Sequence, residues 1–293
     1  MTTLALTLAL SVLVGLSLGL LGGGGSILTV PILVYVAGLD AKEAIAASLF
    51  VVGVTSAVSV VSHARAGRVR WRTGLLFGGA AMVGAYAGGL LGSRVPGELL
   101  LLAFALMMVA TAAAMLRGRR TPEAQPPGDE GPRRELPILK VAVEGVVVGL
   151  VTGLVGAGGG FLVVPALVLL GGLPMSVAVG TSLLVIAMKS FAGLAGYLSG
   201  VQLDWPLVLA VTAAAVVGSV LGARLVGRVP EDALRQGFGW FVLAMGVVVL
   251  AQQLPAPAGA VLVVSALVLG AAAVLCRYAV PSCPLRPARA GAH

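Results

Sequence analysis

The stretch LLGGGGSILTVP, Leu20–Pro31, places four consecutive glycines inside an apolar run. A similar stretch, LVGAGGGFLVVP, follows at Leu154–Pro165. Glycine weakens a helix interior because it adds conformational entropy to the unfolded chain and has no side chain to pack. Each stretch therefore predicts a break between two helical arms, with a proline a few residues into the second arm that bends it and frees a carbonyl.

Composition decides the environment of these breaks. The chain has 293 residues, of which 59% are hydrophobic and 10% charged, and its mean hydropathy is +1.07. Soluble domains carry about 25% charged residues, and several apolar stretches here reach the roughly 18 residues that span a bilayer. We predict an all-α polytopic membrane protein. The N-terminus lacks a basic region before its apolar residues, so we expect a retained membrane segment and not a cleaved signal peptide.

The two glycine stretches belong to an internal repeat. Shifting the chain by 134 residues lays Val14–Pro31 over Val148–Pro165 with 11 of 18 positions identical. The same register continues beyond the glycines. It pairs Ser48 with Ser182, Trp71 with Trp205, Gly84 with Gly218, Gly88 with Gly222, Arg94 with Arg228, and Pro96 with Pro230. The chain is therefore predicted to consist of two homologous halves.

Domain boundaries follow from the repeat. We expect a first transmembrane repeat at 1–116, a cytoplasmic linker at 117–137, a second repeat at 138–252, an additional helix at 253–280 and a tail at 281–293. The linker is rich in proline, glycine and charge, so it is expected to be exposed and flexible. Each half reads as a broken segment followed by three spans. The expected segments are Leu4–Ala37, Ala44–Val61, Gly74–Leu91 and Leu99–Leu116, then Leu139–Leu170, Met175–Leu198, Leu207–Val226 and Ala233–Leu250, with Ala258–Leu275 unpaired.

The distribution of arginine and lysine chooses between two topologies. If each broken segment crosses the membrane once, the basic loop residues divide ten against eight. If each is a hairpin that leaves on the side it entered, sixteen lie on one side and only Lys42 and Arg94 on the other. Cytoplasmic loops carry the excess of positive charge, so we expect re-entrant hairpins. Each half then has three full crossings, which makes the repeats inverted, as in many transporters.

The glycine breaks are candidate binding elements. A helix beginning after each break presents unpaired N–H groups and the positive end of its dipole, which suits an anion. This interpretation places a substrate site at Gly24, Gly25 and Ser26 in the first half and at Gly158, Gly159 and Gly160 in the second. The alternative is that these glycines only allow close helix packing, the interpretation we prefer for Gly84–Gly88 and Gly218–Gly222.

Polar residues mark the segment after each break. Ser48, Thr55, Ser59 and Ser62 recur at helical spacing in the first half, and Ser182 and Lys189 lie on the matching face in the second. Lys189 is the one charge deep within a predicted span, and it aligns with Thr55. A membrane-buried ammonium normally faces a cavity or a partner. Ser48, Thr55, Ser182 and Lys189 are therefore candidate substrate ligands; a structural hydrogen bond or snorkelling to the interface are the alternatives for Lys189.

Three further residues are weaker candidates. His63 and Tyr197 align at the ends of their segments, where each is either a gate or an interfacial anchor. Glu144 lies just inside an apolar segment and is either a proton relay or an interfacial residue. Cys276 and Cys283 flank a proline near the C-terminus, and their spacing predicts neither a disulfide nor a metal site.

The motifs GLLGGGGSILTVPIL and GLVGAGGGFLVVPAL, with AIAASLFVV, AVGTSLLVIAMKSFAGLAGYLSG and two RVP turns, resemble the TauE/SafE family of sulfite exporter-like permeases. The resemblance covers roughly residues 10–252. It implies transport of sulfur-containing anions such as sulfite, sulfoacetate or other organosulfonates, with substrate and direction differing among members. The last span and the tail lie outside it.

The function expected from these observations is secondary transport of a small sulfur-containing anion across the inner cell membrane, by alternating access. A proton or a sodium ion is the candidate coupling ion, and no cofactor or nucleic acid is expected. No GxxxxGK[ST] phosphate-binding loop is present. A membrane enzyme is disfavoured because the chain has two histidines and no acid pair within its spans. A non-transporting membrane partner that supports assembly of another protein remains an alternative.

Overall fold

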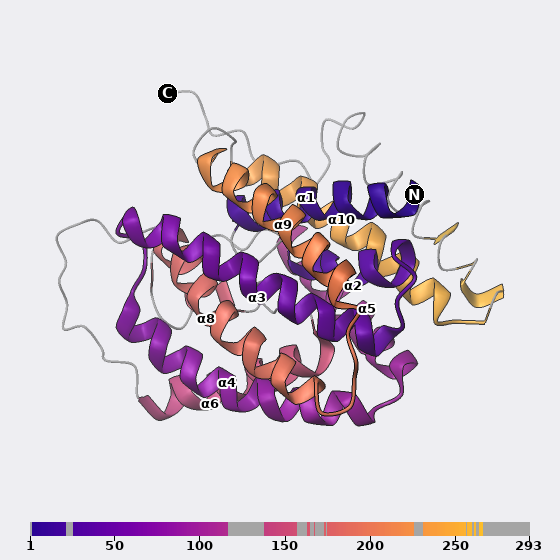
Figure 1. Cartoon of the computed structure of the whole chain (residues 1–293), viewed down its shortest axis with the longest axis horizontal. Helices are drawn as coiled ribbons and strands as arrows, with labels where there is room; N and C mark the ends of the chain where they lie inside the picture. The colour runs from indigo at the N-terminus through magenta and orange to yellow at the C-terminus, as the bar shows by residue number, and fades with distance from the viewer. Residues whose placement is uncertain are drawn as a thin grey trace, which may run out of the picture.

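The computed structural model describes residues 2–21, 26–116, 138–156, 163–164, 167, 173, 175–225, 231–255, 257–259, 261 and 264–265. These residues form helices and contain no strand (Figure 1). The helices are α1 (Thr2–Leu21), α2 (Thr29–Pro31), the π-helix η2 (Ile32–Val36), α3 (Ala41–Arg65), α4 (Trp71–Arg94), α5 (Gly97–Leu116), α6 (Ile138–Val155), α8 (Met175–Tyr197), α9 (Trp205–Leu225) and α10 (Glu231–Gln252).

Five described helices, α1, α3, α4, α8 and α9, are long and apolar enough to cross a membrane. Helices α3 and α8 are the most buried of them, and α1, α4 and α9 turn large apolar side chains outward, among them Leu13, Val83 and Val217. Such exposed apolar faces suit contact with lipid. The chain is therefore an all-helical, multi-pass membrane protein, as its composition predicted. Helices α3 and α4 extend three or four residues beyond the expected spans at each end, because polar and charged residues there continue the helical hydrogen bonding outside the apolar segment.

The first broken segment contains a helix end and a new helix start. Helix α1 ends at Leu21, and a new helical segment begins at Ser26 as a 3₁₀ turn. It continues as α2 and changes to the π-helix η2 directly after Pro31, where the missing N–H interrupts regular hydrogen bonding. Figure 1 shows α1 and α3 running in the same direction, so the segment between them carries the chain back.

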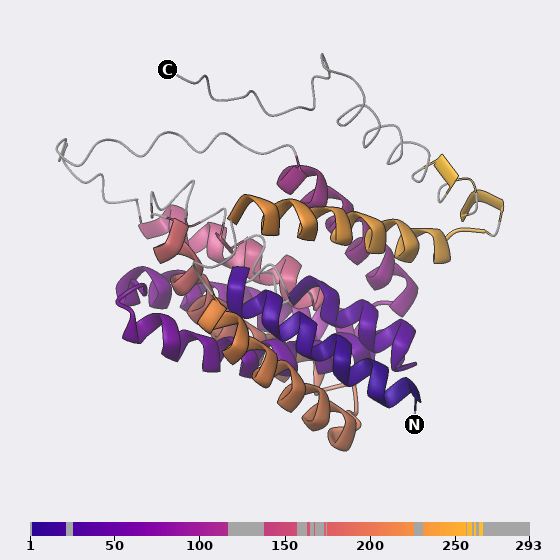
Figure 2. The same cartoon turned by 90° about the horizontal axis from the view of Figure 1, so that it is seen from above.

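Each half packs its first helix against the other half. Helix α1 lies against α9, and α6, its repeat equivalent, lies against α4, the equivalent of α9 (Figures 1 and 2). Glycines make these contacts close. A Cβ atom on Gly84 would overlap the carbonyl oxygen of Val146. A Cβ atom on Gly218, the repeat mate of Gly84, would overlap the carbonyl oxygen of Val12, the repeat mate of Val146. The prediction that these glycines serve close helix packing is confirmed.

Helices α3 and α8 are repeat equivalents that cross at the centre of the fold. A Cβ on Gly53 would lie 3.4 Å from Ser190 Cβ, whereas His63, ten residues later on α3, lies beside Gly180, ten residues earlier on α8. The two helices therefore run antiparallel. The pairing of Gly53 with Ser190 implies that Thr55 on α3 and Lys189 on α8, which are repeat mates, both lie at the crossing.

Candidate functional site

Lys189 is buried within the helix bundle. Its side chain is 1% exposed, and its Nζ donates a hydrogen bond of 2.7 Å to Thr152 Oγ1 on α6. Thr152 in turn donates to the carbonyl of Val148 at 2.7 Å. Burial to this extent contradicts snorkelling, one of the three alternatives for Lys189. Across the residues that the structure describes, no carboxylate forms an ion pair with it, so the amine is held by a neutral acceptor.

The polar pair made by Lys189 and Thr152 occurs in one half of the molecule. The repeat mate of Lys189 is Thr55, whose hydroxyl donates a hydrogen bond to the carbonyl of Val51 in its own helix. The mate of Thr152 is Leu18, a fully buried apolar residue. The two halves share their packing but not their charge, so any site at the α3–α8 crossing is polarised toward the second half.

Ser48 connects the start of α3 to the end of α6. Its Oγ lies 2.6 Å from the carbonyl oxygen of Gly156 and 2.7 Å from that of Ile45. Gly156 has a φ of +71°, and its N–H bonds to the carbonyl of Thr152 at 3.0 Å, so it ends α6 in the left-handed conformation common at helix C-termini. A Cβ on Gly156 would also overlap Ile45. Ser48, a predicted substrate ligand, thus bonds to the C-terminal end of α6, where the second glycine stretch begins.

Tyr197 and His63 are buried, which contradicts interfacial anchoring for both. Tyr197 is 0% exposed, and its hydroxyl donates to the carbonyl of Leu154 at 2.5 Å, next to the end of α6. His63 is 5% exposed; neither ring nitrogen makes a hydrogen bond of ordinary geometry among the described residues, but the ring lies against the backbone of Gly19 near the end of α1. Equivalent positions therefore lie beside equivalent helix ends: Tyr197 bonds to Leu154 near the end of α6, and His63 lies against Gly19 near the end of α1.

The remaining predicted residues are placed as follows. Ser26 is buried at the start of its helix. Ser182 is also buried, and its hydroxyl donates a hydrogen bond to the carbonyl of Val179. Glu144 is half-buried on α6, while Ser62, counted in the polar stripe, is exposed. The glycine positions Gly24, Gly25, Gly158, Gly159 and Gly160 lie outside the described residues, as do Cys276 and Cys283.

The sequence interpretation missed two buried serines, Ser56 and Ser190, and placed a third, Ser59, in the polar stripe without making it a candidate ligand. The hydroxyls of Ser56, Ser59 and Ser190 are buried and have no hydrogen-bond partner among the described residues. Serine in a helix interior usually bonds to a carbonyl of the preceding turn, as Ser182 does. Ser56 and Ser190 are 134 positions apart, so their identity in the repeat alignment was a signal available from sequence.

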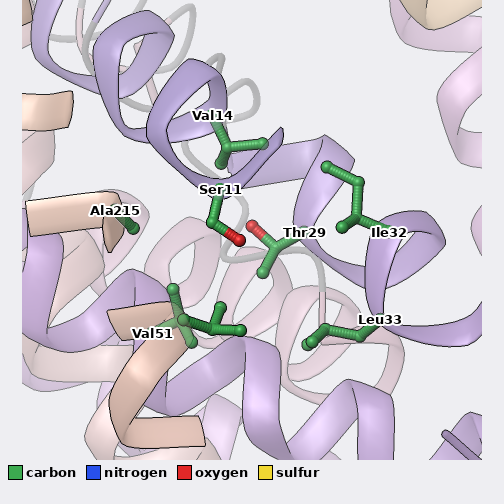
Figure 3. A pocket seen from close by; sticks show the side chains of 8 residues that line it. Ser11, Val14, Thr29, Ile32, Leu33, Val51 and Ala215 are labelled. Carbon is green, nitrogen blue, oxygen red and sulfur yellow. The ribbon is translucent and has the colours of Figure 1, made fainter. Parts of the chain in front are cut away.

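A small cavity lies beside the first broken segment. Its volume is about 10 Å³, and its lining includes Ser11, Thr29, Val51 and Ala215. In Figure 3 the oxygens of Ser11 and Thr29 point toward each other, and the Thr29 hydroxyl has no partner among the described residues. A space of this size holds one water at most. It is therefore too small to be the site of a sulfur oxyanion.

The two ends of the bundle differ in charge. The end where α3 meets α4 carries Arg65, Arg68, Arg70 and Arg72. At the opposite end Lys42 Nζ donates to the carbonyl of Ser93 at 2.9 Å. An open hollow of about 560 Å³ at that end is lined by acidic residues together with Lys42. These acids are Asp40, Glu43 and Glu98. Carboxylates repel an anion, so the hollow is not a candidate anion site.

Comparison with known proteins identifies the class and then the family. A relative from Xylella fastidiosa strain 9a5c, named "Probable membrane transporter protein", is 33% identical over 85% of this chain and 95% of its own length. A relative of the same name from strain Temecula1 is 34% identical over 85% of this chain and 95% of its own. Another from Methanocaldococcus jannaschii, "Probable membrane transporter protein MJ0441", is 27% identical over 84% and 96%. No solved structure matches.

The helical bundle and these names together define a multi-pass membrane transporter and indicate transport in preference to an enzymatic activity. Residues 7–249 match the family described as "Sulfite exporter TauE/SafE". The chain belongs to this family, as its paired glycine motifs predicted.

Proposed function

We propose that the protein is a secondary transporter of small sulfur-containing anions, such as sulfite, sulfoacetate or other organosulfonates, in the inner cell membrane. The observation that carries the proposal is Lys189, an amine 1% exposed at the crossing of two repeat-equivalent helices. Without a carboxylate partner among the described residues, it is available to an anionic ligand. The family description, which names sulfite export, supports the sulfur-containing class.

The proposed mechanism is alternating access between inverted repeats. The antiparallel arrangement of α3 and α8 supports inversion, because equivalent helices that span a membrane in opposite directions require a two-fold axis in the membrane plane.

The arginine-rich end is proposed to be cytoplasmic. Arg65, Arg68, Arg70 and Arg72 gather at one end, and Lys42 and Arg94 at the other (Figure 1), which follows the excess of basic residues on the cytoplasmic side of membrane proteins. This orientation places the linker 117–137 and the C-terminal tail in the cytoplasm as well. The repeats at 1–116 and 138–252 would then enter the membrane from opposite sides.

Accessibility labelling tests this topology. Single cysteines introduced at Arg68, in the linker and in the tail, on a background without the native cysteines, are expected to react with an impermeant maleimide only after the cell is opened. A cysteine at Lys42 is expected to react in intact cells. Opposite accessibility of the linker and the tail would contradict the hairpin topology.

Flux in proteoliposomes tests the function. We expect uptake or release of at least one of sulfite, thiosulfate, sulfoacetate and taurine, measured against acetate and against liposomes without protein. Imposed pH and sodium gradients, applied separately, identify the coupling ion. If none of the sulfur compounds moves across vesicles that contain folded protein, the proposed function is wrong and a non-transporting role is favoured.

A further inference from the structure

Two serines at the centre of the fold have no explained structural role. Ser56 on α3 is 0% exposed and Ser190 on α8 is 1% exposed, and neither hydroxyl has a hydrogen-bond partner among the described residues. A buried hydroxyl without a partner destabilises the folded state. Other buried helical serines of this chain avoid that cost: the hydroxyls of Ser48, Ser182 and Ser219 each bond to a carbonyl three residues earlier.

The two serines face the same helix crossing. Ser190 Cβ lies 3.4 Å from the position that a Cβ on Gly53 would take, so Ser190 faces α3. Ser56 follows Gly53 by three residues, about one turn on the same face of α3. Because the repeat equates Ser56 with Ser190 and Gly53 with Ala187, Ser56 faces α8 in the same way. Along the helix axes, three residues correspond to about 4.5 Å, a separation that one oxyanion bridges.

Lys189 adds a charged donor next to this pair. It precedes Ser190 in the chain, and Thr152 on α6 accepts from its Nζ. A Cβ on Gly193, one turn further along α8, would lie 3.4 Å from Leu49 of α3 and 3.6 Å from Gly153 of α6. Lys189 therefore lies where α3 and α6 meet α8, and its ammonium has three donors, of which Thr152 takes one.

We infer that Ser56 and Ser190 form an oxyanion subsite at the α3–α8 crossing, in which the two repeat-related hydroxyls donate to a sulfite or sulfonate group from opposite halves while Lys189 supplies the charge. The inference rests on the proposed transport function and adds two ligands that the glycine turns and polar stripe did not include. Ser59, although also without a partner, is excluded because its repeat mate is Gly193. Binding requires the two helices to part slightly, a movement that belongs to alternating access.

The test compares three serine-to-alanine variants of the full chain in detergent. Ser56→Ala and Ser190→Ala are each expected to weaken the binding of sulfite and of sulfoacetate by about tenfold, since each removes a hydrogen bond to a charged group. Ser219→Ala is the matched control: Ser219 is equally buried, but its hydroxyl is bonded to Val216 at 2.9 Å. It is expected to leave both affinities unchanged. Isothermal titration calorimetry measures the dissociation constants.

Thermal stability separates binding from packing. Ser56→Ala and Ser190→Ala remove buried hydroxyls without partners, so their Tm is expected to equal or exceed that of the parent while affinity falls. A lower Tm in both variants, or affinities equal to the parent, would overturn the subsite. If the parent itself binds neither anion and transports none of the flux panel, the proposed function fails and the subsite falls with it. If the parent transports a sulfur compound but Ser56→Ala and Ser190→Ala bind it as tightly as the parent does, the subsite is wrong and the proposed function stands.

Discussion

Gly84→Ala is expected to destabilise the protein, whereas Gly79→Ala, five residues earlier on α4, is expected to stabilise it slightly. A Cβ at Gly84 would overlap the carbonyl oxygen of Val146, and backbone cannot move aside without separating α4 from α6. Overpacking of this kind costs about 1–3 kcal/mol. A Cβ at Gly79 meets nothing within 4 Å, so alanine there gains about 0.5–1 kcal/mol from its better helix propensity.

The measurement is the Tm of the purified variants in one detergent, with the folded fraction checked by size exclusion. Gly218→Ala extends the test to the other half, because its contact with Val12 is the repeat equivalent of the contact between Gly84 and Val146. It should lower Tm as Gly84→Ala does. Equal Tm values for the Gly84 and Gly79 variants would show that the close approach of α4 and α6 does not hold in the protein.

Lys189→Met is expected to weaken binding of a sulfur oxyanion by at least about tenfold, or roughly 1.4 kcal/mol. Methionine keeps much of the side-chain length and removes the charge, and helix N-termini supply only about half a charge each. Lys189→Arg should retain part of the affinity, since the charge stays but the planar guanidinium has a different shape. Lys189→Glu should bind more weakly than Lys189→Met because a carboxylate repels the anion. Titration calorimetry at constant pH measures each dissociation constant.

Thr152→Val separates a substrate role for Lys189 from a structural one. The substitution removes the acceptor of the Lys189 hydrogen bond and leaves the amine in place. If Lys189 binds the anion, Thr152→Val should change the affinity far less than Lys189→Met does. If the two variants lose affinity equally, Lys189 acts by linking α8 to α6. Unchanged affinity in both Lys189→Met and Lys189→Glu would remove Lys189 from the site.

Helix positions and the duplication were predictable because they depend on local pattern. Apolar length and the charges at loop ends placed α3, α4, α8 and α9 within a few residues of their observed bounds. The shared glycines of the two halves predicted close packing, which Gly84 and Gly218 confirm. The family followed from the same motifs.

Which polar groups find partners was decided only in the folded molecule. Periodicity placed Lys189 on a small and polar face, but its acceptor Thr152 lies on another helix and aligns with an apolar residue, Leu18, in the other half. The same pattern included Ser62, which is exposed, and omitted Ser56, which is buried at the crossing. The rise and twist of one helix fix which of its side chains share a face. The register and crossing of neighbouring helices fix which residues each side chain contacts. That register depends on residues far apart in the chain, such as Gly53 and Ser190.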